Sequence, residues 1–279
     1  MINIQENILN KYKQYDKLNA SNNETLIKIL VSYIKPSFLF KSEVLTPIHL
    51  GYSVAKETSK DGTISQEDLK WLHENCITDN FEGGISEHNR RIGFLTGTYW
   101  AWKNFDKLDN PQYFGSFGYR RLLNPEFLKD LENYDLILPK KKDFKIEKIK
   151  DQFINYHGQS LYEMALKFAP KDFEEYCNET CGYFDEIYVM KRDLFFDFCE
   201  WIFPILFKYL TLPQIILNGN DYRDIGFIME RLTGYYLNNL TKNKDIKYKE
   251  VDIEITEKVK VNPKIINKEL LANLRKKIK

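Results

Sequence analysis

One short apolar stretch near the middle of the chain constrains the fold more than any other feature. Residues 113–119 (Tyr-Phe-Gly-Ser-Phe-Gly-Tyr) carry no charge, and Arg120 and Arg121 follow at once. An apolar run of this length is typical of a buried strand. In open α/β sheets, ligands bind at the carboxyl ends of the strands. The sequence therefore predicts an α/β protein with a ligand site at this strand end.

An aromatic segment before this strand is predicted to close a long helix. Apolar side chains recur at steps of three and four residues within 86–104, and Tyr-Trp-Ala-Trp-Lys-Asn at 99–104 ends the pattern. Asn89 and Arg90 fall on the first turns of this helix. An arginine there can hold a phosphate or carboxylate through two parallel hydrogen bonds. A surface salt bridge is the alternative interpretation.

Three further apolar runs, at residues 25–33, 135–139 and 182–190, are predicted strands. The first ends at Tyr33 and is followed by Lys35, where nucleotide-binding α/β proteins often contact their ligand. Tyr33 is therefore a candidate for stacking on a base, and Lys35 for contacting a phosphate. The alternative is a tyrosine that closes the core and a solvated lysine.

Charged side chains in the second half of the chain are candidate site residues. Asp185 and Glu186 lie in the middle of the predicted strand 182–190, where burial without a partner would cost several kcal/mol. They therefore require partners or a cleft. Predicted helices at 151–168 and from residue 221 onwards carry the other candidates, which are His157, Arg223, Glu230 and Arg231.

Two polar segments are considered for contact with a ligand. Asp79 to Gly84 ends in two glycines and is predicted to be a flexible loop, a kind of segment that often forms a lid near a ligand. Lys140, Lys141 and Lys142 follow the predicted strand 135–139. They are interpreted as solvated, and contact with an anionic acceptor is the alternative.

Composition excludes several classes of protein. The formal net charge of +1 gives no sign of a nucleic-acid partner. The four cysteines do not form a zinc-ligand pattern, and no apolar run has the length of a membrane span. The polar residues 1–23 do not resemble a signal peptide. The sequence thus predicts a cytoplasmic protein, or one that binds a membrane from outside.

The C-terminal residues have a distinct charge pattern. Residues 258–279 contain eight Lys and Arg against the single Glu269, and 268–279 is predicted to form a basic amphipathic helix. Such a helix suits an anionic membrane surface. A solvated tail or a partner-binding helix are the competing interpretations.

A series of short motifs over about residues 27–252 resembles the signature of a known family. The matching residues, in chain order, are Tyr33, Lys35 and Pro36; Pro47, Ile48 and Gly51; Ile85, Ser86 and Asn89; Leu95, Thr96 and Tyr99 to Asn104; Tyr119 to Arg121; His157; Gly182; Met190 and Lys191; Trp201 and Phe203; and Gly226, Phe227 and Glu230 to Leu232. The family comprises glycosyltransferase-like proteins of bacterial capsular and exopolysaccharide gene clusters, long classed as a domain of unknown function.

Three positions depart from the family pattern. Ile34 and Gly118 stand where the family has histidines, and Phe94 stands where it has a glutamate. If those positions take part in the chemistry, this chain performs it differently or not at all. The departures keep open a second hypothesis, a non-catalytic subunit that binds a nucleotide sugar or a glycan.

The resemblance implies a fold, a domain division and an activity. The fold is α/β and GT-A-like, a Rossmann-related central mixed sheet flanked by helices, with a helical C-terminal extension. Residues 1–24 form a helical appendage, 25–252 the glycosyltransferase domain and 253–279 the basic tail. The implied activity transfers a hexosyl or related sugar from a nucleotide-sugar donor, expected to be UDP-linked, to a capsular polysaccharide or lipooligosaccharide acceptor. The acceptor can also be lipid-linked, and the expected location is the cytoplasm, with a peripheral position at the inner membrane.

The resemblance also implies roles for the candidate residues. Glu230 is the first choice as the catalytic base, with Asp185 and Glu186 second, and a structural pair of Glu230 with an arginine is the alternative. His157, Arg223 and Arg231 are expected to contact acceptor or phosphate. Because the tip of the strand offers arginines and no Asp-x-Asp, we expect no metal cofactor to be required. The donor is expected to contact Tyr33, Lys35, Asn89, Arg90, Lys103, Asn104, Tyr119, Arg120 and Arg121.

Overall fold

The computed structural model describes residues 4–20, 24–56, 64–217 and 222–257. In this part of the chain a nine-stranded sheet has the order β10-β6-β9-β4-β1-β2-β3, and β5 joins β4 to β11. β9 is antiparallel to β4 and β6, whereas the β1, β2, β3 and β4 neighbours are parallel. The strands are β1 (Ile27–Tyr33), β2 (Leu45–His49), β3 (Ile77–Thr78), β4 (Tyr113–Gly118), β5 (Arg121–Leu123), β6 (Leu136–Pro139), β9 (Tyr188–Lys191), β10 (Tyr248–Val251) and β11 (Ile253–Ile255). A separate pair is β7 (Lys142–Asp143) with β8 (Cys181–Gly182).

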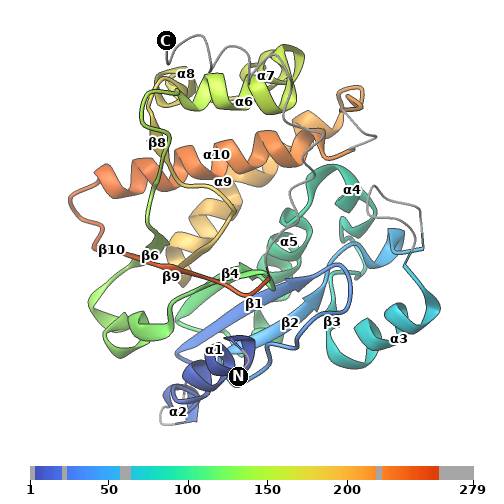
Figure 1. Ribbon diagram of the computed structural model, residues 1–279, viewed down its shortest axis with the longest axis vertical. Helices are drawn as coiled ribbons and strands as arrows, with labels where there is room; N and C mark the ends of the chain where they lie inside the picture. The colour runs from blue at the N-terminus through green and yellow to red at the C-terminus, as the bar shows by residue number, and fades with distance from the viewer. Residues whose placement is uncertain (1–3, 21–23, 57–63, 218–221, 258–279) are drawn as a thin grey trace, which may run out of the picture.

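Helices cover both faces of the sheet, and a further layer lies beyond one face (Figure 1). α9 packs on β4 and β9, α10 packs on α9, and α6 to α8 lie outside α10. α1 and α3 lie on the opposite side of the sheet. The helices are α1 (Ile4–Lys13), α2 (Lys17–Ala20), α3 (Gln66–Asn75), α4 (Asn89–Ile92), α5 (Leu95–Lys103), α6 (Ile149–His157), α7 (Gln159–Leu166), α8 (Phe173–Cys177), α9 (Arg192–Leu210) and α10 (Asp224–Lys242). Short 3-10 turns lie at Tyr52–Val54, Ser86–His88, Phe105–Leu108, Pro125–Lys129 and Leu131–Asn133.

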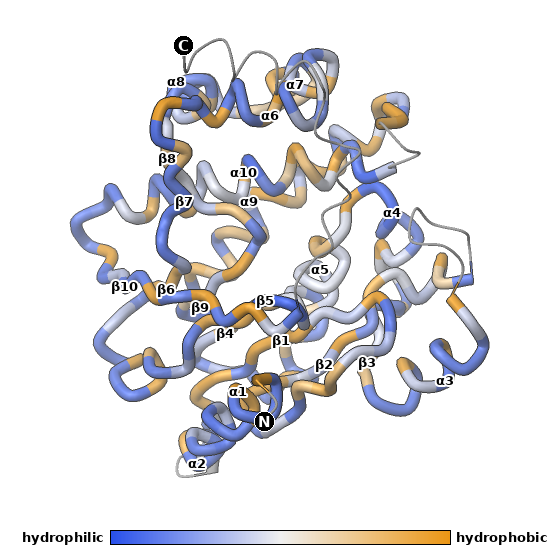
Figure 2. Tube along the Cα trace, viewed as in Figure 1, coloured by the Kyte–Doolittle hydropathy of each residue, from blue (hydrophilic) through white to orange (hydrophobic). Residues whose placement is uncertain are grey.

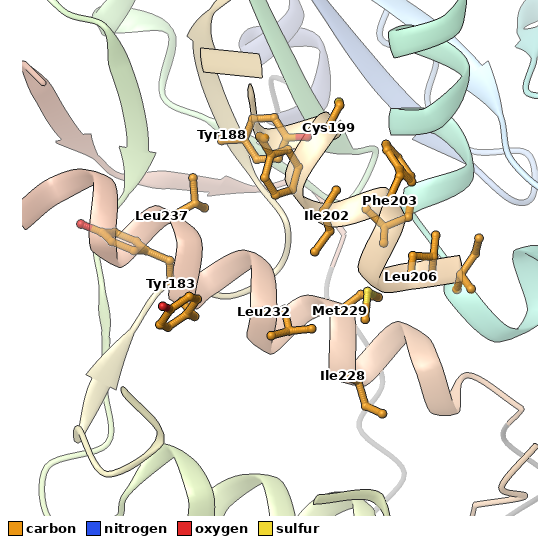
Figure 3. Packing of buried hydrophobic residues seen from close by; sticks show 14 of the residues in the cluster. Tyr183, Tyr188, Cys199, Ile202, Phe203, Leu206, Ile228, Met229, Leu232 and Leu237 are labelled. Carbon is orange, nitrogen blue, oxygen red and sulfur yellow. The ribbon is translucent and has the colours of Figure 1, made fainter. Parts of the chain in front are cut away.

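Two hydrophobic cores follow from the alternation of side chains along the strands. On β1, Leu30 belongs to the core under α5 and α9, whereas Val31 belongs to the core beside α1. Hydrophobic residues gather along the central strands (Figure 2). Between α9 and α10, side chains such as Phe203 and Met229 interdigitate (Figure 3). Each fully buried side chain of this size contributes about 1.5–3 kcal/mol.

Three predicted elements are interrupted by residues with positive φ. The predicted helix 86–104 is broken at Gly93 (φ 59°), and 151–168 is broken at Gly158 (φ 92°). The predicted strand 182–190 is also wrong as one element. β8 and β9 are separated by a turn in which Asp185 has φ 71° and Glu186 has φ 51°. The spacing of apolar residues continues through all three breaks, so the breaks cannot be predicted from that spacing.

Both ends of the described chain are attached to the sheet. The Tyr12 hydroxyl of α1 donates a 2.6 Å hydrogen bond to the Leu123 carbonyl. At the other end β11 pairs with β5, so the sheet continues past residue 252. The predicted basic helix at 268–279, and with it the helical extension, lies outside the described residues. Within the described ranges no helix is both long enough and apolar enough to cross a membrane.

The topology brings several strand ends to one edge. Since β1, β2, β3, β4 and β6 run in the same direction, their carboxyl ends lie together. β9 runs the other way, so the turn at Asp185 and Glu186, which precedes it, reaches the same edge. This carboxyl edge is where a ligand site of an open α/β sheet is expected.

Candidate active site

Arg120 and Arg121 stand at a tight reversal at the carboxyl end of β4. Tyr119 and Arg120 form the turn, and Arg121 pairs with Gly118 as β5 begins. The two arginines are then held by different groups: Arg120 Nε lies 3.6 Å from a carboxylate oxygen of Glu257, whereas Arg121 reaches Asp185. The structure therefore brings Arg121, and not the pair, into the cluster described below.

Two cations hold the Asp185 carboxylate. Arg121 Nη1 donates to one carboxylate oxygen, and Lys142 Nζ donates to the other. The Asp185 side chain is 11% exposed, whereas those of Arg121 and Lys142 are 39% and 44% exposed. The cations are thus open to an anion arriving from solvent, while the carboxylate between them is shielded. Lys142, which the sequence analysis interpreted as solvated, is a member of this site.

Glu230 of α10 fixes the turn that carries Asp185. Its Oε1 accepts a 3.0 Å hydrogen bond from the Asp185 backbone N–H, and its Oε2 accepts a 2.6 Å bond from Arg231 Nη1. Burial alone would raise the pKa of Glu230, but the Arg231 charge and these hydrogen bonds outweigh it and lower the pKa below its ordinary value. Both carboxylate oxygens of Glu230 therefore accept hydrogen bonds. The ion pair with Arg231 is the structural pair that was the alternative to a catalytic base.

Arg231 is itself buried and links Glu230 to the outer helices. The residue is 3% exposed, and its Nη2 donates a 2.6 Å hydrogen bond to Gln152 Oε1 of α6. Its guanidinium lies 4.5 Å from the centre of the Phe184 ring. Enclosed in this way, Arg231 does not present a free charge to a ligand, and its expected role as a phosphate or acceptor contact is not supported.

Glu186 has a different environment from its neighbours. Its Oε1 is buried and has no hydrogen-bond partner among the described residues. Burial, followed by the charges of Glu230 and Asp185, raises the pKa of Glu186 well above its ordinary value. Asp185 and Glu186 both have a left-handed backbone, a conformation that costs about 1 kcal/mol or more per residue and is concentrated at functional sites. The pKa values of Glu186 and Glu230 are shifted in opposite directions, a pattern typical of acid–base sites.

Lys103 and Asn104 lie away from this cluster, contrary to expectation. Helix α5 begins beside the carboxyl end of β4, where a Cβ on Gly118 would lie 3.1 Å from the Phe94 ring. The helix then runs back along the sheet and ends at Lys103, before the chain enters the amino end of β4 at Tyr113. Asn104 Nδ2 caps α5 through a 3.0 Å bond to the Trp100 carbonyl. Both residues are therefore at the opposite edge of the sheet.

Tyr33 and Asn89 have structural contacts in place of their expected ligand contacts. Tyr33 is fully buried, stacks on Tyr119 with ring centres 5.1 Å apart, and donates its hydroxyl to the Phe38 carbonyl. No surface of its ring, or of the buried Tyr119 ring, is free to stack on a base. Asn89 Nδ2 donates to the Gly93 carbonyl at 2.9 Å and to Thr96 Oγ1 at 3.0 Å, which holds the break between α4 and α5.

The remaining expected residues are spread over the molecule. Arg90 Nη2 donates a 2.9 Å hydrogen bond to the Val54 carbonyl, while Lys35 is exposed at the end of β1. His157 and Arg223 gather on one ring: His157 stacks on Phe227 at 3.9 Å, and the Arg223 guanidinium lies 5.1 Å from the same ring. Phe227 precedes Arg231 by one turn of α10.

The predicted lid loop begins at a fixed point. Asp79 is fully buried, and its carboxylate accepts hydrogen bonds from the Gly51 N–H at 2.6 Å, the Tyr52 N–H at 3.1 Å and the Ser86 hydroxyl at 2.6 Å. The Asp79 side chain thus fastens the segment after β2 to the segment before α4. The first residue of the predicted loop is therefore fixed by these bonds, and the role of the loop as a lid stays a prediction.

Two of the three departures from the family pattern lie against each other. Gly118 leaves room for the Phe94 ring at the end of β4, and Ile34 is 39% exposed at the end of β1. The Phe94 ring thus occupies space beside Gly118, at two positions where the family pattern has a glutamate and a histidine. Among the described residues, no three His, Cys, Asp or Glu side chains converge so as to hold a metal ion. The tip of β4 therefore does not fit a carboxylate-bound metal.

Comparisons with known proteins support the fold. A family model described as a domain of unknown function (DUF4422) matches residues 28–244. Among solved structures, the chain is similar to the apo structure of the WbbM bifunctional glycosyltransferase, with a TM-score of 0.64 and 22% identity over 84% of this chain. The match covers 46% of that chain, so this protein spans less than half the length of its structural relative. No curated protein matches. The expected α/β fold with a central mixed sheet flanked by helices is confirmed, and the sheet is mostly parallel.

Proposed function

Because this chain belongs to the family described as a domain of unknown function (DUF4422), and has the fold of a glycosyltransferase, we propose that it is a glycosyltransferase. It transfers a sugar from a nucleotide-sugar donor to a glycan or lipid-linked acceptor. The finer expectations belong to this proposal: a UDP-linked donor, a capsular polysaccharide or lipooligosaccharide acceptor, and a cytoplasmic position that is peripheral at the inner membrane.

The observation that carries this proposal is the carboxylate between two partly exposed cations at the carboxyl edge. A nucleoside diphosphate leaving group bears negative charge, and preorganised cations stabilise that charge as it develops. Arg121 and Lys142, which hold Asp185 near the end of the central strand β4, support this role. Their charges supply the stabilisation that a metal would otherwise provide, so the proposal routes no step through a metal.

Asp185 is the carboxylate that best fits the role of base. A donor diphosphate would compete for Arg121 and Lys142 and thereby release Asp185. The acceptor hydroxyl then attacks the anomeric carbon, the bond from that carbon to the diphosphate breaks, and the hydroxyl proton passes to the Asp185 carboxylate. Glu230, the first choice from sequence, has both oxygens engaged and positions the turn. Glu186 remains the second candidate for this proton transfer.

The test is release of nucleoside diphosphate or monophosphate from a panel of UDP-, GDP- and CMP-sugars, with and without glycan acceptors. At least one donor should turn over. Binding of a donor without turnover would favour the alternative of a non-catalytic binding subunit. In parallel, activity should survive EDTA. Activity that disappears with EDTA and returns with manganese would contradict the role given to the two cations.

A further inference from the structure

A second feature of the carboxyl edge lies two strands away from the Asp185 cluster. A pocket of about 250 Å³ opens at the carboxyl ends of β2 and β3, beside α3. Among the described residues, no Asp, Glu, Lys or Arg side chain lines it. The lining residues are His49, Tyr52, Leu72, His73, Cys76 and Thr78. An uncharged lining favours a neutral ligand over a phosphate or carboxylate.

His49 is the residue that marks this pocket as a binding site. It is 1% exposed, and neither of its ring nitrogens has a hydrogen-bond partner within the described residues. Polar atoms buried without partners are energetically costly, so they are rare in folded proteins. Burial lowers the pKa of His49 to about 4, with Asp79 opposing the shift and His73 adding to it. The ring is therefore neutral and offers one N–H donor and one acceptor.

The walls of the pocket suit a flat ring. The Tyr52 and His73 rings lie 5.0 Å apart, and each lies about 6 Å from the His49 ring. Aromatic rings stabilise planar partners by stacking or by edge contacts. A planar, neutral heterocycle with neighbouring donor and acceptor groups matches both the walls and the unpaired nitrogens. Nucleobases have this chemistry.

We propose that the His49 pocket binds the nucleobase of the sugar donor. This inference rests on the proposed function. Adjacent strands lie about 4.8 Å apart, so β2 and β4 are separated by about 10 Å along the edge. The exposed Lys35 at the end of β1 lies between them, in the strand order β4-β1-β2. The donor would then lie along the edge in the order of the strands. Its base would lie at β2, its phosphates along β1 and β4, and its sugar near Asp185.

The first experiment observes the His49 ring directly. The full chain, labelled at its histidines, is titrated by NMR with uridine, cytidine, adenosine and guanosine, and separately with inorganic pyrophosphate. At least one nucleoside should shift the His49 ring signals, whereas pyrophosphate alone should leave them unchanged. Pyrophosphate that moves His49 as strongly as every nucleoside would overturn the assignment.

The second experiment uses variants that separate base from phosphate. His49→Phe removes two unpaired nitrogens, so the protein should fold with an unchanged or higher Tm. Its affinity for the preferred nucleoside diphosphate should fall about tenfold, the effect of losing a hydrogen bond to a buried partner. Tyr52→Ala, at a position 38% exposed, should weaken nucleoside binding as well. His88→Phe, outside the pocket and half-exposed, is the matched control and should bind normally.

A third variant distinguishes failure of this inference from failure of the proposed function. Arg121→Met should weaken binding of the diphosphate and still allow the nucleoside to shift His49. Normal nucleotide binding by His49→Phe and Tyr52→Ala would place the base elsewhere and overturn the inference alone. Absence of any nucleotide binding by the wild-type chain would overturn both.

Discussion

At the scale of single residues, the arrangement of Asp185 between Arg121 and Lys142 makes a specific prediction. Asp185→Asn should lower turnover by about 10²–10⁴-fold, the usual contribution of a general base. Nucleotide affinity should be retained or should increase, because the two cations lose a competing carboxylate. Steady-state kinetics and calorimetric titration with the nucleotide measure the two effects.

Asp252, which follows β10 at the carboxyl edge of the sheet, provides a matched control for this variant. Asp252 forms an exposed ion pair with Lys140 at 2.8 Å, outside the candidate site. Asp252→Asn should leave both turnover and affinity unchanged, since an exposed pair contributes little. Equal losses in the two aspartate variants would show that the effect of Asp185→Asn is not specific to the cluster.

Glu230 gives a prediction that separates a positioning residue from a base. Glu230→Gln leaves the buried Arg231 without its anion, so the free energy of unfolding should fall by roughly 3 kcal/mol. Turnover should fall with it, because the Asp185 turn loses its support. Denaturant unfolding measures the stability, and Glu126→Gln, in an exposed pair with Lys129, should change it by less than about 0.5 kcal/mol. A fully stable but inactive Glu230→Gln would restore Glu230 as the base.

His49 predicts how stability depends on pH. Its pKa is about 4 in the folded protein against 6.5 when unfolded, so between these values the unfolded state binds more protons. The free energy of unfolding therefore rises with pH over this window, by up to about 3 kcal/mol. Acidification from pH 7 to 4.5 should lower the Tm of the wild type more than that of His49→Phe. The raised pKa of Glu186 acts in the opposite direction, but it is present in both proteins and cancels.

At the scale of elements, the breaks in the predicted helices and strand show what periodicity misses. The helices around 93 and 158 keep their apolar spacing across a glycine with positive φ, so the sequence predicted their existence but not their division. The turn at Asp185 and Glu186 was not foreseeable, because neither residue is a glycine. Its conformation depends on Glu230, which lies 45 residues further along the chain.

Gly93 offers a test of this view. Its φ of 59° and ψ of −125° suit glycine almost alone, although a Cβ would meet no atom within 4 Å. Gly93→Ala should therefore lower the free energy of unfolding by about 1–3 kcal/mol through backbone strain only. Lys70→Ala, on the exposed face of α3, is the reference and should stay within about 0.5 kcal/mol. Denaturant unfolding measures the stability of both variants. Equal stability of Gly93→Ala and Lys70→Ala would mean that this backbone conformation does not require glycine.

The structure brings together some of the expected site residues and separates others for a topological reason. Arg121 was predicted at the end of an apolar run, and it lies at the carboxyl edge. Asp185 was singled out as a carboxylate in the middle of a predicted strand, whereas it lies in a turn at the same edge. Lys103 and Asn104 were misplaced because they neighbour the strand in sequence, whereas a helix that precedes a parallel strand ends at the amino edge. Lys142 was named only within a run of three lysines, with contact with an anionic acceptor as the alternative interpretation, and His49 was not singled out. Only the three-dimensional structure shows the partners that single them out.

At the scale of the whole molecule, α10 joins the outer helices to the sheet edge. Arg231 contacts Gln152 of α6 on one side and Glu230 on the other, and Glu230 contacts the Asp185 turn. The outer layer and the candidate active site are thus one connected structure. At the end of β4, the absence of a side chain on Gly118 leaves room for the Phe94 ring.

The most direct test of the account is release of nucleotide from its preferred sugar donor by three proteins measured side by side. They are the wild type, Arg121→Met and Lys140→Met, in which Lys140 is an exposed lysine outside the cluster. The account predicts turnover by the wild type, normal turnover by Lys140→Met, and a loss of at least about 100-fold in Arg121→Met. Unchanged turnover in Arg121→Met would contradict the claim that sugar transfer takes place at the Arg121, Lys142 and Asp185 cluster.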